Sequence, residues 1–364
     1  MLACLGSKRM LKKRSVVIDG RQLTGNIGGG VQRYISEILF ELDKLVKPGE
    51  YEILIPKKTN IVCEYKNIKI VNYGRLRGLL WEQICLPFYL WKNKLYGVFP
   101  CTIVPLLYPK GIVVLHDVMI ASRPELGDSF SNPLAKKLLL ANYRIAARHA
   151  DAVCTVSENS RKDISEIYGK DLDDIHVIGN AWQHMERVQM DDSWRKKYPQ
   201  LKEGKYYFSL SANRKQKNFK WIYEMAIRNP NVIFAMAGTR EEWQRVQEYE
   251  APNIIHLGFV SDGEVKSLMH HCKAFLFPSF YEGFGIPPME ALSAGAKIVI
   301  ANSSCLPEIY RDSAYYIDPY SYDINLEELL KNKVAPAENV LNRYSWKISA
   351  CKLNEICKNI AVGL

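Results

Sequence analysis

The chain has 364 residues, of which 48% are hydrophobic and 24% are charged. This composition excludes disordered and fibrous classes and predicts a globular protein of about two domains. No run reaches the roughly 18 apolar residues that a membrane-spanning helix needs. The formal net charge of +10 indicates an anionic partner. Because we find no nucleic-acid-binding motif, an anionic membrane surface is the better interpretation.

The cysteine pattern favours reduced thiols. The nine cysteines are scattered, their number is odd, and no C-x-x-C pair occurs, which predicts a cytosolic protein without a disulfide framework or zinc site. His270-His271-Cys272 has adjacent residues on an expected helix, and such residues point apart. Asp171-Leu-Asp173 has the D-x-D form but lies in a polar connection, where we expect a solvated loop. We therefore expect no metal and no cofactor.

Strand-like and helix-like segments alternate through the first half. The expected strands cover residues 15–19, 51–55, 68–71, 111–115, 151–156 and 175–178, and helices cover residues 31–45 and 132–149. Ser157 provides the side chain of an N-cap for a further helix. Strand–helix alternation predicts an α/β fold with parallel sheets covered on both faces.

One segment of the first half allows two interpretations. Residues 75–94 have basic ends and an apolar middle that contains Trp and Tyr. This pattern suits an interfacial helix at an anionic membrane, as does the basic segment at residues 8–14. A core helix with a solvated basic face leaves the same pattern, so both interpretations stay open.

A polar, charged stretch leads into the second half, where the alternation resumes. The expected strands are residues 206–210, 232–237, 254–257, 274–277 and 297–301, separated by helices. In open parallel sheets, ligands bind beyond the carboxyl ends of strands. Three sets of residues follow strands in this way: Gly28-Gly29-Gly30, His116, and the cations Arg214, Lys215 and Lys217. The glycine loop lacks the full G-x-G-x-x-G fingerprint because Arg33 stands at the third position.

The most informative feature is a pair of glutamates, Glu282 and Glu290. The loop between them contains Gly283 and Gly285, which allow the backbone to come close to a ligand, and Pro287, which suits the first turn of a helix. A glycine loop before a helix N-terminus forms an anion site. Carboxylates are poor neighbours for phosphate, so the glutamates more plausibly accept hydrogen bonds from hydroxyls. A nucleotide sugar is one ligand that carries phosphates and diols together.

The segment Glu282-Gly-Phe-Gly-Ile-Pro-Pro-Met-Glu290 resembles the E-x7-E motif of retaining glycosyltransferases of family 4, and Leu306-Pro-Glu308 continues the pattern. The resemblance implies the GT-B fold, in which two Rossmann-like parallel-sheet domains face each other across a cleft. The expected acceptor-binding domain covers residues 1–182 and the nucleotide-sugar-binding domain residues 183–342. Tyr344-Ser-Trp-Lys resembles the family's tail, so residues 343–364 are expected to return to the first domain as a helix.

The resemblance also implies roles for individual residues. Glu282 and His116 would contact the transferred sugar, with Glu282 favouring an oxocarbenium-like state, and Glu290 would bind the ribose diol. The backbone of Val260 would touch the nucleotide base. The groups expected to hold the diphosphate are Gly29, Gly30, Arg214, Lys217, and the backbone N–H groups around Gly283, Phe284, Gly285 and Ile286.

The implied activity is transfer of a hexose from a nucleotide sugar to a hydroxyl with retention of configuration and without a metal. Trp81-Glu-Gln83 resembles a subset of the family that assembles bacterial capsule and O-antigen, which implies a mannose- or rhamnose-like donor. GDP-mannose is the favoured donor, with UDP- and dTDP-sugars left open, and the acceptor would be a glycan or a polyprenyl-diphosphate lipid. This implies a cytoplasmic protein, peripheral at the inner face of the cell membrane. The alternatives are a nucleotide-sugar epimerase, a catalytically silent scaffold and a nucleic-acid binder.

Overall fold

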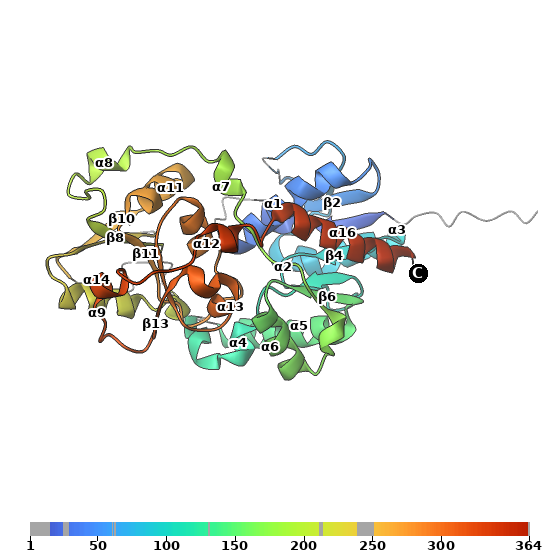
Figure 1. The fold of residues 1–364 in the computed structure, drawn as a ribbon. Coiled ribbons are helices and arrows are strands. Elements are labelled where there is room, and N and C mark those ends of the chain that lie inside the picture. Colours follow the sequence, from blue (N-terminus) through green and yellow to red (C-terminus); the bar gives the residue numbers. More distant parts are fainter. Residues whose placement is uncertain are drawn as a thin grey trace, which may run out of the picture.

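The computed structural model describes residues 15–24, 29–59, 61, 63–129, 132–210, 214–238 and 251–362. These residues form two α/β bodies that lie side by side, each built on one parallel sheet (Figure 1). The expected α/β class with two parallel sheets is confirmed. The basic segment at residues 8–14, Gly28 and residues 211–213 lie outside the described residues.

The first body contains a seven-stranded sheet of order β3-β2-β1-β4-β5-β6-β7. Its strands are β1 (Val16–Asp19), β2 (Tyr51–Pro56), β3 (Lys69–Tyr73), β4 (Tyr96–Phe99), β5 (Ile112–Val114), β6 (Ala152–Thr155) and β7 (Ile175–Val177). Every neighbouring pair is parallel. β1 is buried along its whole length, as expected for a central strand with helices over both faces.

The second body contains a six-stranded parallel sheet of order β10-β9-β8-β11-β12-β13. Its strands are β8 (Tyr206–Leu210), β9 (Ile233–Ala237), β10 (Ile254–Gly258), β11 (Ala274–Phe277), β12 (Ile298–Ala301) and β13 (Tyr315–Ile317). In both sheets the order changes direction beside the strand that starts the body. Such a switch point is where open α/β sheets bind ligands.

The helices connect successive strands. In the first body they are α1 (Gly30–Leu45), α2 (Gly78–Leu80), a π-helical turn (Trp81–Cys85), α3 (Leu86–Asn93), α4 (Met119–Ser122), α5 (Pro133–His149) and α6 (Glu158–Tyr168). The crossing between the bodies holds α7 (His184–Arg187) and α8 (Trp194–Lys197). The remaining helices are α9 (Phe219–Arg228), α11 (Asp262–His271), α12 (Ile286–Ser293), α13 (Leu306–Tyr310), α14 (Leu326–Leu329), α15 (Glu338–Leu341) and α16 (Trp346–Val362).

Helix boundaries follow the local chemistry that the sequence indicates. Ser157 caps α6, with its Oγ accepting a hydrogen bond from the backbone N–H of Ser160, and Asn132 caps α5 in the same way. Prolines occupy the first turn of α12 as expected. Among the described residues, no helix combines the length and apolarity required to cross a bilayer.

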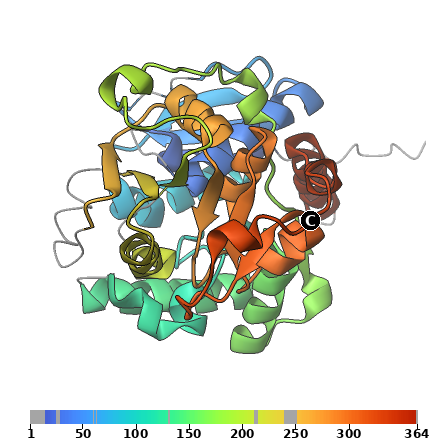
Figure 2. The ribbon, with the colours of Figure 1, turned by 60° about the vertical axis from the view of Figure 1, so that its left-hand side comes forward.

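The last helix returns to the first body. α16 packs along α1 (Figure 1), and this return is also visible after a 60° turn (Figure 2). Its buried side chains recur every three to four residues, from Trp346 through Ala350 and Leu353 to Cys357. The Ser349 hydroxyl donates to the carbonyl of Ile178 at 2.7 Å.

The structure adds elements that the sequence pattern did not reveal. β4 and β13 are extra strands, and the polar crossing contains α7 and α8. β13 has only three residues, too few to show a period. β4 follows α3 after two residues, so the apolar residues of the two elements merge into one run.

Candidate functional site

A cavity of about 430 Å³ opens between the two bodies. From the first body it is lined by Gly29 and Gly30 at the N-terminus of α1 and by His116 beyond β5. From the second body it is lined by Arg214, Lys217, Glu282, Gly283, Phe284, Gly285, Ile286 and Glu290. The structure therefore brings together eleven of the twelve site residues expected from the sequence, although their roles stay predictions.

Val260 is the exception. It lies two residues beyond β10, is half-buried and packs against the apolar core. The described residues that line the cavity do not include it. A backbone contact between Val260 and a nucleotide base stays a prediction.

Glu282 is positioned by its own half of the molecule. Its Oε1 accepts a hydrogen bond from Nζ of Lys217 at 2.7 Å. Its backbone N–H donates to the Ser304 hydroxyl at 3.0 Å. The carboxylate is largely buried, so the ion pair with Lys217 offsets the cost of placing a charge there. This arrangement holds the negative charge of Glu282 beside the cavity. Lys217 contacts only Oε1 of the carboxylate and not Oε2.

Lys217 is held in turn by its neighbours. The adjacent Asn218 adopts a left-handed conformation with φ of +51°, and its side-chain amide donates to the carbonyls of Pro278 and Pro319. Nζ of Lys217 also lies 4.9 Å from the centre of the Phe277 ring, within the range of a cation–π contact. Arg214 lines the same cavity but is exposed.

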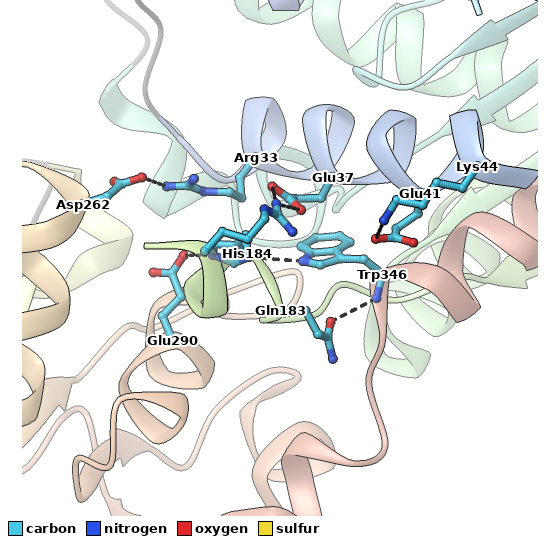
Figure 3. Close-up of polar contacts among 10 residues, drawn as sticks. Arg33, Glu37, Glu41, Lys44, Gln183, His184, Asp262, Glu290 and Trp346 are labelled. Carbon is cyan, nitrogen blue, oxygen red and sulfur yellow. Dashed lines mark hydrogen bonds and ion pairs between the residues drawn. The ribbon is translucent and has the colours of Figure 1, made fainter. Parts of the chain in front are cut away.

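Glu290 depends on other parts of the chain. Its Oε1 lies 2.7 Å from Nε2 of His184, a buried residue of the crossing. The indole N–H of Trp346, at the start of α16, donates to Nδ1 of the same ring at 3.2 Å. Because Nδ1 accepts, the ring proton belongs on Nε2 and is donated to Glu290. Figure 3 shows the His184 ring between the carboxylate and the indole.

His116 is a neutral group at this site. Its Nε2 lies 2.8 Å from the carbonyl of Pro100, and a carbonyl can only accept, so Nε2 carries the proton. Burial lowers the pKa of His116 to about 4, against a smaller opposing effect of this hydrogen bond. The Tyr34 ring meets the imidazole edge-on, with ring centres 4.7 Å apart. His116 can therefore accept a hydrogen bond at Nδ1 near neutral pH but cannot act there as a cation.

The loop before α12 packs tightly against other parts of the protein. A Cβ on Gly283 would lie 2.5 Å from the carbonyl oxygen of His116, so the close neighbour is the backbone of the first body. Gly285 has φ of +83°, and a Cβ there would lie 2.8 Å from the Leu306 side chain. Protein contacts therefore already favour glycine at both positions, and the close approach of a ligand to this loop stays a prediction. The loop nevertheless directs the N-terminus of α12 toward the cavity, as an anion site requires.

Three charged residues that line the cavity were not expected from the sequence. Arg33 of α1 donates to Asp262 at 2.7 Å, and Figure 3 shows this contact between the two bodies. Burial alone would lower the pKa of Arg33, but the carboxylates of Asp262 and Glu290 outweigh it and raise the pKa. Asp117 also lines the cavity, and burial raises its pKa.

The sequence signal for these residues was weak. Arg33 appeared only as the residue that breaks a glycine fingerprint, and His184 lies in a polar stretch without periodicity. No cluster of three or more His, Cys, Asp or Glu side chains suited to a metal occurs in the described part of the chain.

Comparison with known proteins identifies the second body. Residues 190–344 match the family described as glycosyl transferases group 1. O-antigen chain mannosyltransferase B of Escherichia coli is 25% identical over 361 residues, which cover 87% of this chain and 93% of that protein. O-antigen chain mannosyltransferase RfbU of Salmonella typhimurium is 26% identical over 293 residues, covering 75% of this chain and 77% of that protein.

Solved structures show the same fold. Sucrose-phosphate synthase from Thermosynechococcus elongatus superimposes with a TM-score of 0.73 at 12% identity, covering 96% of this chain and 100% of that one. HepE of Anabaena, in complex with UDP and glucose, superimposes with a TM-score of 0.68 at 15% identity, covering 96% and 100%. Residues 190–344 therefore match a glycosyl transferases group 1 domain, and this domain lies within a GT-B fold.

Proposed function

We propose that this protein is a glycosyltransferase that moves a hexose from a nucleotide-diphosphate sugar to a hydroxyl of a glycan or lipid-linked acceptor, with retention of anomeric configuration. GDP-mannose is the proposed donor, and bacterial surface polysaccharide is the proposed product. The observation that carries the proposal is that Glu282, Glu290, Lys217 and the N-terminus of α12 line one cavity between the two bodies. Carboxylates for hydroxyls and cations for phosphates match the two chemical parts of a nucleotide sugar.

The diphosphate would lie between the N-termini of α1 and α12 and the cations of the second body. Lys217 and Arg214 would neutralise the charge that builds up on the leaving nucleoside diphosphate as the glycosidic bond breaks. The backbone N–H groups from Gly283 to Ile286, together with Gly29 and Gly30, would donate to its oxygens. The departing phosphate oxygen would accept the proton of the attacking hydroxyl.

The hexose would lie between Glu282 and His116. Glu282 would accept hydrogen bonds from ring hydroxyls, and its negative charge would stabilise an oxocarbenium-like state. His116, neutral because burial lowers its pKa to about 4, would accept from a sugar hydroxyl at Nδ1. Glu290 would accept from the ribose hydroxyls with the oxygen that His184 does not occupy. None of these steps uses a metal ion.

Two further points belong to this proposal. We assign acceptor binding to a domain of residues 1–182 and donor binding to residues 183–342, with residues 343–364 returning to the first domain. The preference for mannose is supported by the names of two relatives, both O-antigen mannosyltransferases. The names of HepE complexes with UDP and UDP-glucose support a nucleotide-sugar donor in general, which keeps UDP- and dTDP-sugars in the test.

The proposal is tested by a thermal-shift panel of GDP-, UDP- and dTDP-sugars on the wild type and on Glu290→Ala. Since ligand binding raises the melting temperature by mass action, we expect one base to raise it, and the shift to weaken in the variant. The stabilising donor is then incubated with lipid-linked glycan acceptors, and the anomeric configuration of the product is determined. Absence of any shift would contradict the donor site, and conversion of the donor without an acceptor would favour an epimerase.

A further inference from the structure

The segment with two sequence interpretations is apolar on two opposite faces. α2, the π-helical turn and α3 run continuously from residue 78 to residue 93. One face is buried against the first sheet through Trp81, Leu86 and Leu90. The other face carries Leu80, Ile84, Phe88 and Trp91, which are exposed by 61%, 54%, 49% and 69%. The core-helix interpretation therefore explains one face and leaves an exposed apolar stripe unexplained.

A second helix on the same side of the sheet repeats this arrangement. α5 buries Tyr143, Ala146 and Ala147 in the apolar cluster that also contains Trp81 and Leu90. Its outward side exposes Leu134 and Leu138. Because α5 and the α2–α3 segment cover the same face of the sheet, their exposed sides both point away from that face.

The loop around residues 104–107 is hydrogen-bonded to both the α2–α3 segment and α5. The Gln83 amide donates to the carbonyl of Val104 at 3.1 Å and accepts from the backbone N–H of Leu106 at 2.8 Å. Asn142 of α5 pairs with both backbone groups of Val104. Leu107, which follows Leu106 in this loop, is 91% exposed. The exposed leucines, Ile84, Phe88 and Trp91 thus belong to one side of the molecule, which we call the outer face of the first sheet.

The exposed charges of the α2–α3 segment and of α5 have one sign. Residues 75–94 contain four Lys and Arg residues, and α5 contains four more. The same two segments contain a single acid, Glu82, which is buried and ion-paired with Arg21. Seven of the eight cations are exposed, and Lys136 is half-buried. The outer face therefore combines exposed apolar side chains with cations and presents no acidic side chain from these helices.

We propose that the outer face of the first sheet binds a membrane surface that contains anionic lipid. Exposed Leu, Ile, Phe and Trp side chains would enter the boundary between headgroups and acyl chains, and the surrounding Lys and Arg side chains would pair with lipid phosphates. Trp91 beside Lys92 has the amphipathic pairing typical of membrane interfaces. A second copy of the chain fits poorly, because it would bring together the cations of two α2–α3 segments and two α5 helices, and these segments expose no acid that would offset them.

This inference is independent of the donor chemistry. It needs only the exposed side chains and their charges, so it can be tested without any sugar or acceptor. If the proposed lipid-linked acceptor is also correct, this face would bring the cavity to the bilayer that holds the acceptor. A failure of membrane binding would leave the donor site untouched.

The test is flotation of the protein with vesicles of phosphatidylcholine alone or with phosphatidylglycerol added. We expect binding to the anionic vesicles and a loss of binding at high salt, since surface charges are screened. Ile84→Ser should reduce the bound fraction, whereas Ile227→Ser should not. Ile227 is 51% exposed in α9 of the second body, against 54% for Ile84, so the two changes remove similar apolar areas.

A charge test complements the apolar one. Lys92→Gln combined with Lys137→Gln should lower partitioning onto anionic vesicles by about 30-fold, at roughly 1 kcal/mol for each cation near the surface. The control is Lys202→Gln combined with Lys205→Gln, two exposed lysines of the second body. Equal losses in test and control variants would overturn the proposal. So would a dimer in solution that Ile84→Ser dissolves, because the outer face would then be an interface between copies.

Discussion

The two glutamates of the cavity differ in how they are held. Glu282 is paired with Lys217, and both residues belong to loops of the second sheet. Glu290 is paired with His184 of the crossing, and Trp346 of the last helix orients that histidine. One end of the cavity is therefore built by the second body alone. The other end is complete only when three distant parts of the chain meet.

Removing the negative charge of Glu282, at the end of the cavity built by the second body alone, should have the largest effect on activity. Glu282→Gln keeps the shape of the side chain but removes the negative charge that faces the proposed sugar. We expect kcat to fall by about 10² to 10³-fold, because electrostatic stabilisation of the transition state is lost. The measurement is initial-rate kinetics of sugar transfer with the donor found in the thermal-shift panel.

A control separates this effect from damage to the loop. Ser304→Ala removes the hydroxyl that accepts from the Glu282 backbone N–H but leaves the carboxylate in place, so a much smaller loss of kcat is expected. Near-normal kcat in Glu282→Gln would show that its charge is not needed for transfer.

At the Glu290 end of the cavity, His184→Ala should weaken donor binding. The change leaves one oxygen of Glu290 without its buried donor, and such a loss costs about 1–3 kcal/mol, or roughly 5- to 150-fold in Kd. Titration calorimetry with the nucleoside diphosphate measures it, and His184→Gln, which retains an N–H donor, should recover part of the affinity. A 2′,3′-dideoxy analogue should bind wild type and variant alike. If the analogue loses as much affinity as the ribonucleotide, His184 does not act through the ribose.

The role of Trp346 can be isolated with a matched pair of indoles. Trp346→Phe removes the N–H that donates to His184, whereas Trp182→Phe removes the N–H that donates to the carbonyl of Leu341 at 2.9 Å. We expect a rise in Kd of roughly 2- to 10-fold for the first, the value of one hydrogen bond. The second should change stability without changing Kd. Equal changes in Kd would mean that the tautomer of His184 does not depend on Trp346.

The pH dependence should show that His116 remains neutral. Burial lowers its folded-state pKa to about 4 from an ordinary value of 6.5, so between these values the unfolded chain binds more protons than the folded one. Stability should therefore fall as the pH is lowered from about 6.5 to about 4. Urea unfolding at pH 7 and pH 5 measures this slope, and His116→Asn should reduce it. An unchanged slope in the variant would assign the acid sensitivity to other groups.

The smallest effect is expected for the contact between the two bodies at Arg33. Arg33 and Asp262 form a partly exposed ion pair, and such pairs contribute about 0–1 kcal/mol. Asp262→Asn should lower the melting temperature slightly, and added salt should remove the difference from wild type. A large, salt-independent loss would indicate that this pair does more than join the two bodies.

The same comparison explains what the sequence could predict. The Glu282–Glu290 loop could be read because its prolines, glycines and acids act within a few residues of one another. Lys217 was found because it lies in the loop beyond an expected strand, at a position that resembles the family's diphosphate-binding lysine. His184 and Trp346 acquire their roles only through the packing of the crossing and the last helix, and no local pattern records that packing. The sequence pattern did not predict β4, because β4 follows the apolar residues of α3 without a clear boundary.

The same limit applies to the outer face. The sequence showed apolar and basic residues between positions 75 and 94, but periodicity alone cannot separate a buried face from an exposed one. The described structure answers this by exposing Ile84 and Trp91 while burying Trp81 and Leu90. Both faces of one helical segment are apolar, and only the position of the sheet distinguishes them.

The return of α16 has a consequence for the order of events during synthesis. Tyr51 of β2 shares a hydrogen bond of 2.8 Å with Asn354 of α16, across 303 positions of the chain. Domains generally fold as they leave the ribosome, yet α1 has its partner helix only when α16 has been translated. Until then, the side of α1 that packs against α16 stays exposed. The His184 ring that contacts Glu290 also lacks its hydrogen bond from Trp346. Any activity that depends on the Glu290 end of the cavity should therefore appear only once residues 346–357 have been translated.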